Sequence, residues 1–198
     1  MIEQRTPEWF EARRGKPTAS QFSKILTSKL KPSKSAEKYM NELLLEKLGR
    51  PMVQYVENDA MRIGIAREPN GVAAFELVTG IETEEAGFML SECGRFGASP
   101  DRTWDDGVLE LKCPLEKTHK SYSLEPRVPT KYVLQLRSQM MIADKPIGYF
   151  CSYHPDHLPH VVRVERDPEW DQAFQEGLKT FLDELDSKYE IACNNILS

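Results

Sequence analysis

Ser99-Pro100-Asp101, followed by Val108-Leu109-Glu110-Leu111-Lys112-Cys113, is the stretch that decides the fold. From Val108 onward apolar and charged residues alternate, and this pattern predicts a short strand. Successive side chains of a strand point to opposite faces, so the leucines and Cys113 share one face and Glu110 and Lys112 share the other. The strand is therefore expected to bury one face in a core and to present an acid beside an ammonium group on the other.

Asp101, nine positions before Glu110, supplies a second carboxylate to this stretch. Carboxylate oxygens are the ligands that Mg²⁺ prefers, and a bound metal lowers the pKa of its water and clamps phosphate oxygens. The ammonium of Lys112 suits the orientation of that water or the neutralisation of developing charge. These residues fit metal-assisted phosphodiester cleavage. An edge strand with a solvated Glu–Lys pair explains them equally well. Choosing between these two interpretations requires the rest of the sequence.

The composition indicates a globular protein. The chain has 198 residues, of which 40% are hydrophobic and 29% charged, and this length suits one domain spanning residues 1–198. It lacks a run of about twenty apolar residues, and Glu3, Arg5 and Glu8 interrupt the N-terminal segment. We therefore expect no membrane partner and a cytoplasmic location.

Charge is unevenly distributed along the chain. The net charge is −5, yet residues 1–34 contain eight basic and three acidic residues. Residues 165–190 contain nine acidic and three basic residues. A basic N-terminal segment and an acidic C-terminal segment make a polarised molecule, so the negative total does not exclude a nucleic-acid partner.

Hydrophobic periodicity and capping residues predict alternating helices and strands. Helices are expected over 7–15, 18–26, 36–48, 58–78, 132–143 and 168–192, and strands over 81–90, 95–98, 108–113, 146–153 and 161–164. The first three strands suggest a meander. Pro69-Asn70-Gly71 is expected to kink or break the fourth helix. Order and lengths indicate a mixed α/β domain with a central sheet covered by helices.

Two groups of polar residues each allow two interpretations. Thr18 and Ser20 begin the second predicted helix, near Arg13. Their hydroxyls fit either an anion site or ordinary helix capping. His154, His157 and His160 lie three apart, a spacing that resembles that of metal ligands. Because prolines interrupt this segment, we expect a surface turn, in which the histidines need not converge on a metal.

Several segments together resemble one family. They are Gln4-Arg5 with Trp9-Phe10-Glu11-Ala12-Arg13-Arg14-Gly15, Thr18-Ala19-Ser20, Gly64-Ile65-Ala66-Arg67-Glu68, Ser99-Pro100-Asp101, Leu109-Glu110-Leu111-Lys112-Cys113-Pro114 and Tyr132-Val133-Leu134-Gln135. In order and spacing the chain resembles the phage lambda exonuclease family (YqaJ-type viral recombinases) of the PD-(D/E)xK nuclease superfamily. The resemblance implies an α/β restriction-endonuclease-like core, with a central mixed sheet flanked by helices.

The resemblance also implies roles for the residues of the metal site. Asp101, Glu110 and the Leu111 carbonyl would bind Mg²⁺, with two ions expected and Mn²⁺ as an accepted substitute. Glu68 would complete the acidic cluster, and Lys112 would assist the attacking water. Pro69 departs from the expected helix directly after Glu68.

Further residues are implied to contact DNA or to support the site. Gln135 would lie near the active site, and Arg13, Ser20 and Ser99 would line a pocket for the 5′-phosphate of a DNA end. Arg137 stands where the family often has a second glutamine, and this substitution suggests a direct phosphate contact.

The implied activity is a Mg²⁺-dependent 5′→3′ exonuclease on linear duplex DNA. It would release 5′-mononucleotides and leave a 3′ single-stranded overhang for recombination in a bacterial host cell. The resemblance also implies a homotrimeric ring and a single-strand annealing protein as partner. Two alternatives are a restriction-type or RecB-like endonuclease with the same metal core, and a non-catalytic DNA-end-binding protein.

Overall fold

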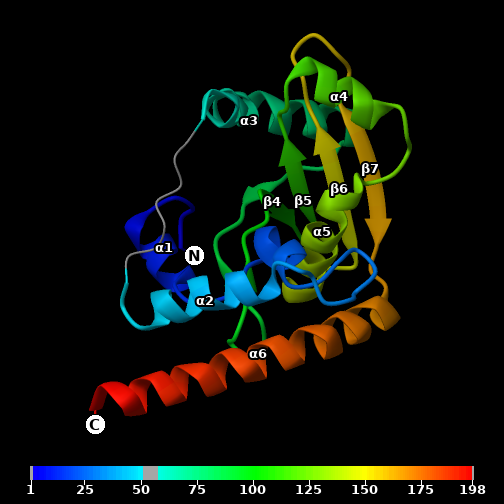
Figure 1. The fold of residues 1–198 in the computed structure, drawn as a ribbon. Coiled ribbons are helices and arrows are strands. Elements are labelled where there is room, and N and C mark those ends of the chain that lie inside the picture. The colour runs from blue at the N-terminus through cyan, green and yellow to red at the C-terminus, as the bar shows by residue number, and fades with distance from the viewer. Residues whose placement is uncertain (1, 51–57, 198) are drawn as a thin grey trace. The chain divides into compact units, whose positions relative to one another are not determined.

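The computed structural model describes residues 2–50 and 58–197, which form two compact units. The first unit takes the described residues of 2–50, 87–99 and 167–197, and the second takes 58–86 and 100–166. Figure 1 shows the elements of both. Within the described ranges, no helix combines the length and the apolar character that a membrane span requires.

The first unit begins with α1 (Pro7–Arg13), which confirms the predicted start of the first helix. The Thr6 side chain caps it by accepting a hydrogen bond from the Trp9 amide, and Pro7 occupies the first turn. The second predicted helix is instead a six-residue 3₁₀ helix, η1 (Ala19–Lys24). Its predicted apolar residues are nevertheless buried: Phe22, Ile25 and Leu26.

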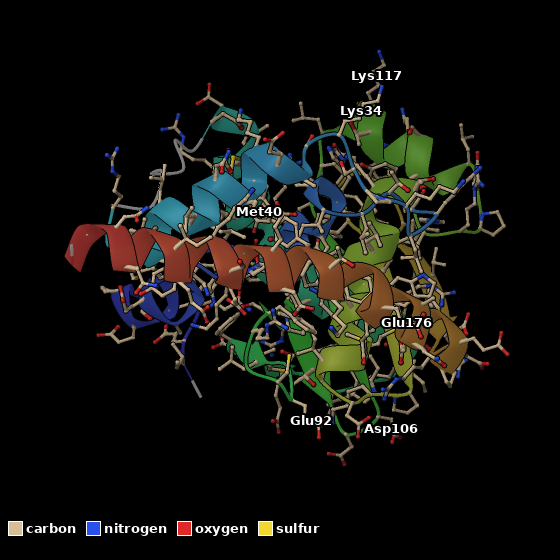
Figure 2. The ribbon with its side chains drawn as sticks, turned by 60° about the horizontal axis from the view of Figure 1, so that its bottom comes forward. Lys34, Met40, Glu92, Asp106, Lys117 and Glu176 are labelled. Atoms are coloured by element: carbon tan, nitrogen blue, oxygen red, sulfur yellow. The ribbon has the colours of Figure 1, made fainter. Side chains whose placement is uncertain are left out.

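The rest of the first unit packs two long helices together, α2 (Ala36–Lys47) and α6 (Pro168–Leu197). Met40, labelled in Figure 2, is one of the buried residues of α2. Tyr39 stacks on Phe181 at 6.3 Å between ring centroids. A two-stranded antiparallel sheet of β2 (Met89–Leu90) and β3 (Gly97–Ala98) completes this unit.

The second unit is built on a five-stranded sheet in the order β1-β4-β5-β6-β7. The strands are β1 (Glu84–Glu85), β4 (Arg102–Trp104), β5 (Gly107–Lys112), β6 (Ile147–Ser152) and β7 (His160–Glu165). The β5–β6 pair is parallel and the others are antiparallel. This is the predicted mixed central sheet, but the strands that precede β5 in the chain differ from the predicted ones.

The predicted three-stranded meander is wrong. β5 pairs with β4, a strand that the pattern did not indicate, and β3 belongs to the separate small sheet. A three-residue strand is too short to show alternation. The sequence feature that indicates β4 is Asp105-Asp106-Gly107, because this composition is typical of a tight turn between paired strands.

Helices cover both faces of β5, which is a central strand. Leu109, Leu111 and Cys113 form a core cluster with Phe75 of α3 (Asp59–Thr79). On the opposite face, Val108 packs with residues of α5 (Thr130–Ile142). The eight-residue α4 (Glu116–Ser123) lies between β5 and α5 in the chain. A solvated edge strand is therefore excluded as the explanation of the Glu110–Lys112 pair.

The expected break at Pro69-Asn70-Gly71 is also wrong, because α3 runs without interruption from Asp59 to Thr79. Pro69 is exposed, so the one carbonyl that loses its intrahelical donor lies on the outer side of the helix. Gly71 faces the sheet, and a Cβ atom there would lie 3.0 Å from Leu111 Cδ2. Close packing of this face on β5 keeps the helix continuous through the proline.

The predicted turn is present, and two of its histidines lie beside a further histidine of α4. His154 and His157 lie with their ring centroids 5.5 Å apart, and His119 of α4 is 6.2 and 5.6 Å from them. His154 is buried, and the turn contacts α4 through the rings of His154 and His157 beside His119. Both ring nitrogens of His119 are used: Nδ1 lies 2.9 Å from Ser152 Oγ, and Nε2 lies 3.2 Å from the Leu158 carbonyl.

This histidine cluster makes stability depend on pH. Burial lowers the pKa of His119, with the neighbouring imidazoles adding to the effect, and burial alone lowers the pKa of His160. The unfolded chain therefore binds more protons than the folded one below about pH 6.5, and the stabilisation present above that pH is lost on acidification. We expect Tm to fall between pH 7.5 and 5.5, and His119→Gln to show a shallower fall. An unchanged slope in that variant would contradict this role.

Candidate active site

The acidic residues and the lysine of the opening stretch meet at β5. Glu110 is completely buried and its carboxylate contacts the Lys112 ammonium. Asp101 Oδ2 lies 3.9 Å from the same ammonium and accepts a hydrogen bond of 2.6 Å from the Leu111 amide. The backbone amide of Asp101 donates in turn to the Leu109 carbonyl at 3.0 Å. The β4–β5 pairing thus brings the two carboxylates to one ammonium.

Burial and charge act in opposite directions on this cluster. Burial raises the pKa of Glu110 to about 7, and Lys112 opposes that rise. Burial lowers the pKa of Lys112, but the adjacent carboxylates outweigh it and hold that pKa above its usual value. Lys112 therefore stays an ammonium at neutral pH, so it can donate hydrogen bonds and offset negative charge, and it is no proton acceptor.

Two glutamines on successive turns of α5 hold the Glu110 carboxylate. Gln135 Nε2 donates to Oε1 at 2.7 Å, and Gln139 Nε2 donates to Oε2 at 2.6 Å. Gln135 was expected near the site, and Gln139 was not. The four-residue spacing places both amides on the same helix face, and this was the sequence signal for Gln139. Arg137, half-buried, lies between them in the sequence.

Glu68 lies on the face of α3 that packs against β5. A Cβ atom on Gly64 would lie 3.6 Å from the Cys113 carbonyl, and Gly71 contacts Leu111. Because residues 64, 68 and 71 follow helical spacing, Glu68 shares their face. The charges of Glu68 and Asp101 both raise the pKa of Cys113, after the larger effect of burial. The uninterrupted helix therefore leaves Glu68 near this end of β5, despite Pro69.

The donor set suits a hard divalent cation. Asp101 and Glu110 offer carboxylate oxygens, the type of ligand that Mg²⁺ and Mn²⁺ prefer, and Lys112 already places one positive charge between them. Among residues 2–50 and 58–197, no group of three or more ligating side chains is close enough to form a metal centre. The remaining ligands would have to be water, substrate oxygens or the predicted Leu111 carbonyl.

A separate group of aromatic and hydroxyl side chains surrounds Arg13 in the first unit. The guanidinium stacks on Trp9 at 3.8 Å from the ring centroid, and Phe88 lies 5.6 Å away. It donates to Ser99 Oγ at 3.1 Å and to Thr18 Oγ1 at 3.2 Å. Trp9 Nε1 donates to the same Ser99 oxygen at 3.0 Å. Two aromatic rings and two hydroxyls therefore fix one guanidinium in place.

Within the described part of the chain, Arg13 forms no ion pair, since its polar contacts are neutral hydroxyls. Burial lowers its pKa to about 10, which still leaves it charged at neutral pH. The Thr18 hydroxyl does not cap η1, so ordinary capping is the wrong interpretation for Thr18. Ser20 is exposed in the first turn of η1. Trp9 and Phe88 were not predicted; the four-residue spacing of Trp9 and Arg13 was the available signal.

A mixed sheet covered by helices, with two carboxylates and a lysine at its central strand, defines an α/β nuclease. The chain belongs to the YqaJ-like viral recombinase family, whose model matches residues 8–146. This result confirms both the predicted family and the predicted fold class. The comparison with curated protein sequences gives no match.

Solved structures support the same assignment. The chain is similar to an alkaline exonuclease (LHK-Exo) from Laribacter hongkongensis, with 30% identity over 97% of this chain and 98% of that chain, and a TM-score of 0.87. The structure of LHK-Exo in complex with dAMP matches with the same values. A phage-related exonuclease from Haemophilus somnus matches at 14% identity over 87% of this chain and 96% of that one, with a TM-score of 0.66, and shows the fold alone.

Proposed function

We propose that the protein is a Mg²⁺-dependent 5′→3′ exonuclease that degrades linear duplex DNA and leaves a 3′ single-stranded overhang. The proposed direction of digestion rests on Arg13, whose guanidinium is held in place and hydrogen-bonds only to uncharged hydroxyls among the described residues. A 5′-phosphate would give Arg13 a charged partner in direct contact and would accept charge-assisted hydrogen bonds. Ser99 and Ser20 are proposed as further contacts to this phosphate, and Arg137 of the second unit is proposed as a separate contact to a DNA phosphate.

The proposed roles at the cleavage site follow from charge and contact. Asp101 and Glu110 would hold the ion, with the Leu111 carbonyl as a further ligand and Glu68 acting directly or through water. When bound, the ion supplies Lewis-acid polarisation of the phosphate and a lowered pKa for its water. Lys112 orients the attacking water and offsets charge on the phosphate oxygens. Gln135 keeps Glu110 oriented through its hydrogen bond to Oε1.

The product and the assembly belong to the same proposal. LHK-Exo has been solved in complex with dAMP, a deoxynucleoside monophosphate, and this supports release of 5′-mononucleotides here. We extend the proposal to a single functional nuclease domain over residues 1–198, a homotrimeric ring, a single-strand annealing partner and a cytoplasmic location in a bacterial host. In such a ring the basic segment 1–34 would face the DNA, and the acidic α6 would lie outside.

Comparing linear with closed circular duplex tests the reaction class. With Mg²⁺ we expect linear duplex to be degraded while a covalently closed circle of the same sequence survives, because a circle offers no 5′-phosphate end. Chelation by EDTA should stop the reaction, and Mn²⁺ should restore it. Equal cutting of the circle would favour the endonuclease alternative, and binding of ends without cleavage in either metal would favour the non-catalytic one.

A further inference from the structure

Gln139 of the second unit combines a buried carboxylate partner with a buried polar atom that lacks one. Its side chain is completely buried, and its Nε2 donates to Glu110 Oε2 at 2.6 Å. Its Oε1 is buried as well and has no hydrogen-bond partner in the described part of the chain. Its neighbours along α5 include Leu136 and Met140, both of which pack in an apolar cluster. If the position only had to fill space, an apolar side chain would avoid the free-energy cost of burying a polar group.

The orientation of the Gln139 amide is fixed by the charge that it faces. If the amide were turned over, its oxygen would lie against a carboxylate oxygen, and two acceptors would repel each other. The observed orientation therefore leaves Oε1 unsatisfied in order to keep the N–H on Glu110. A buried acceptor without a partner costs free energy, and such groups in native structures call for an explanation.

The hydrogen bonds to Glu110 show which of its oxygens the Gln139 amide leaves open to a further partner. A carboxylate has about four lone-pair positions. Lys112 and Gln135 both contact Oε1, whereas Gln139 alone contacts Oε2. The unused position is therefore on Oε2, the oxygen that Gln139 holds.

We propose that Gln139 is a positioning residue that orients Glu110 for the divalent ion, acting together with Gln135 as an amide clamp on its two oxygens. The inference rests on the proposed function, because it takes Glu110 as a metal ligand. Groups that hydrogen-bond a metal ligand from outside commonly change metal affinity about 10- to 100-fold when they are removed. Gln139 reaches Glu110 rather than the ion, so it affects binding through the geometry of the carboxylate.

The test is Mn²⁺ binding to the metal-free full-length protein, measured by calorimetry, with Tm recorded in the absence of metal. Gln139→Met keeps the length of the side chain and removes the donor. We expect its Mn²⁺ affinity to fall about 10- to 100-fold, and the Mg²⁺ concentration for half-maximal digestion to rise in parallel. Ser138→Ala is the matched control. Ser138 is also completely buried in α5, but it donates to the Gln135 carbonyl rather than to Glu110, so its Mn²⁺ affinity should stay at the wild-type value.

Gln139→Asn provides a second variant should Gln139→Met fail to fold. Its amide is one methylene shorter and cannot reach Oε2, so the same loss of affinity is expected. Wild-type affinity in a folded Gln139 variant, or an equal loss in Ser138→Ala, would overturn the inference while leaving the proposed function intact. A wild-type protein that binds no Mn²⁺ would overturn both.

Discussion

Asp101→Asn should lower the rate of DNA digestion by about 10³-fold or more while leaving DNA binding largely unchanged. The asparagine side chain keeps an oxygen that can accept the hydrogen bond that the Leu111 amide now donates to Oδ2 at 2.6 Å. The strand pairing should therefore survive, and only the negative charge beside Lys112 is lost. Single-turnover digestion at saturating enzyme, combined with a gel-shift measurement of binding, separates the two effects.

Asp106→Asn is the control for this experiment. Asp106 is exposed at the turn between β4 and β5, and Figure 2 shows it at the surface. The same chemical change at this position removes a charge from the same hairpin without touching the carboxylate cluster, so wild-type activity is expected. Full activity in Asp101→Asn would show that the cleavage site has been assigned to the wrong residues.

Arg13→Leu should abolish the preference for 5′-phosphorylated over 5′-hydroxyl ends. Arg13 forms no ion pair among the described residues, although the charge of Glu46 acts on it, so its guanidinium can pair with a phosphate. Hydrogen bonds to charged groups contribute about 1.5–3 kcal/mol, which corresponds to about 10- to 100-fold in kcat/KM. We expect wild type to favour the phosphorylated end by this factor, and the variant to digest both ends equally slowly.

Arg14→Leu is the matched control, since it removes the neighbouring guanidinium. Arg14 already pairs with Glu11 at 2.8 Å and donates to the Arg50 carbonyl at 3.1 Å. Its charge is therefore neutralised within the protein, and the end preference should be retained. A preference that persists in Arg13→Leu, or that disappears in Arg14→Leu, would contradict the proposed phosphate pocket.

The long periodic segments of the fold could be predicted from the sequence. α2, α5 and β6 lie within about two residues of their predicted bounds, and the face alternation of β5 is as expected. These elements carry enough apolar residues at a regular spacing to identify both their type and their buried face. The end of α6 was placed too early, at residue 192 rather than at Leu197.

The errors arose where tertiary contacts outweigh local signals. α3 continues through Pro69 because Gly71 and Phe75 pack on β5, and no local pattern reveals that packing. β4 is too short to show a period, and its partner is what defines it. The contact of His154 and His157 with His119 likewise depends on how the turn after β6 lies against α4.

In the candidate site too, residues set by local geometry could be predicted, and residues set by tertiary contacts could not. Asp101, Glu110 and Lys112 could be identified from spacing and residue type alone, because strand geometry fixes which side chains share a face. The four-residue spacing from Gln135 was a signal for Gln139, but it points to a role only once the partner is known to be a buried carboxylate. The contact of Arg13 with Phe88 likewise joins residues far apart in the chain.

The most direct test of the central claim is the order in which label leaves a linear duplex in Mg²⁺. The duplex carries 5′-phosphates on both strands, and the label is placed at the 5′ end in one sample and at the 3′ end in the other. The proposed 5′→3′ exonuclease should release the 5′ label first, as a mononucleotide, while the 3′ label stays on a long single strand. Release of the 3′ label first, or of both labels on internal fragments, would contradict the proposed direction of attack.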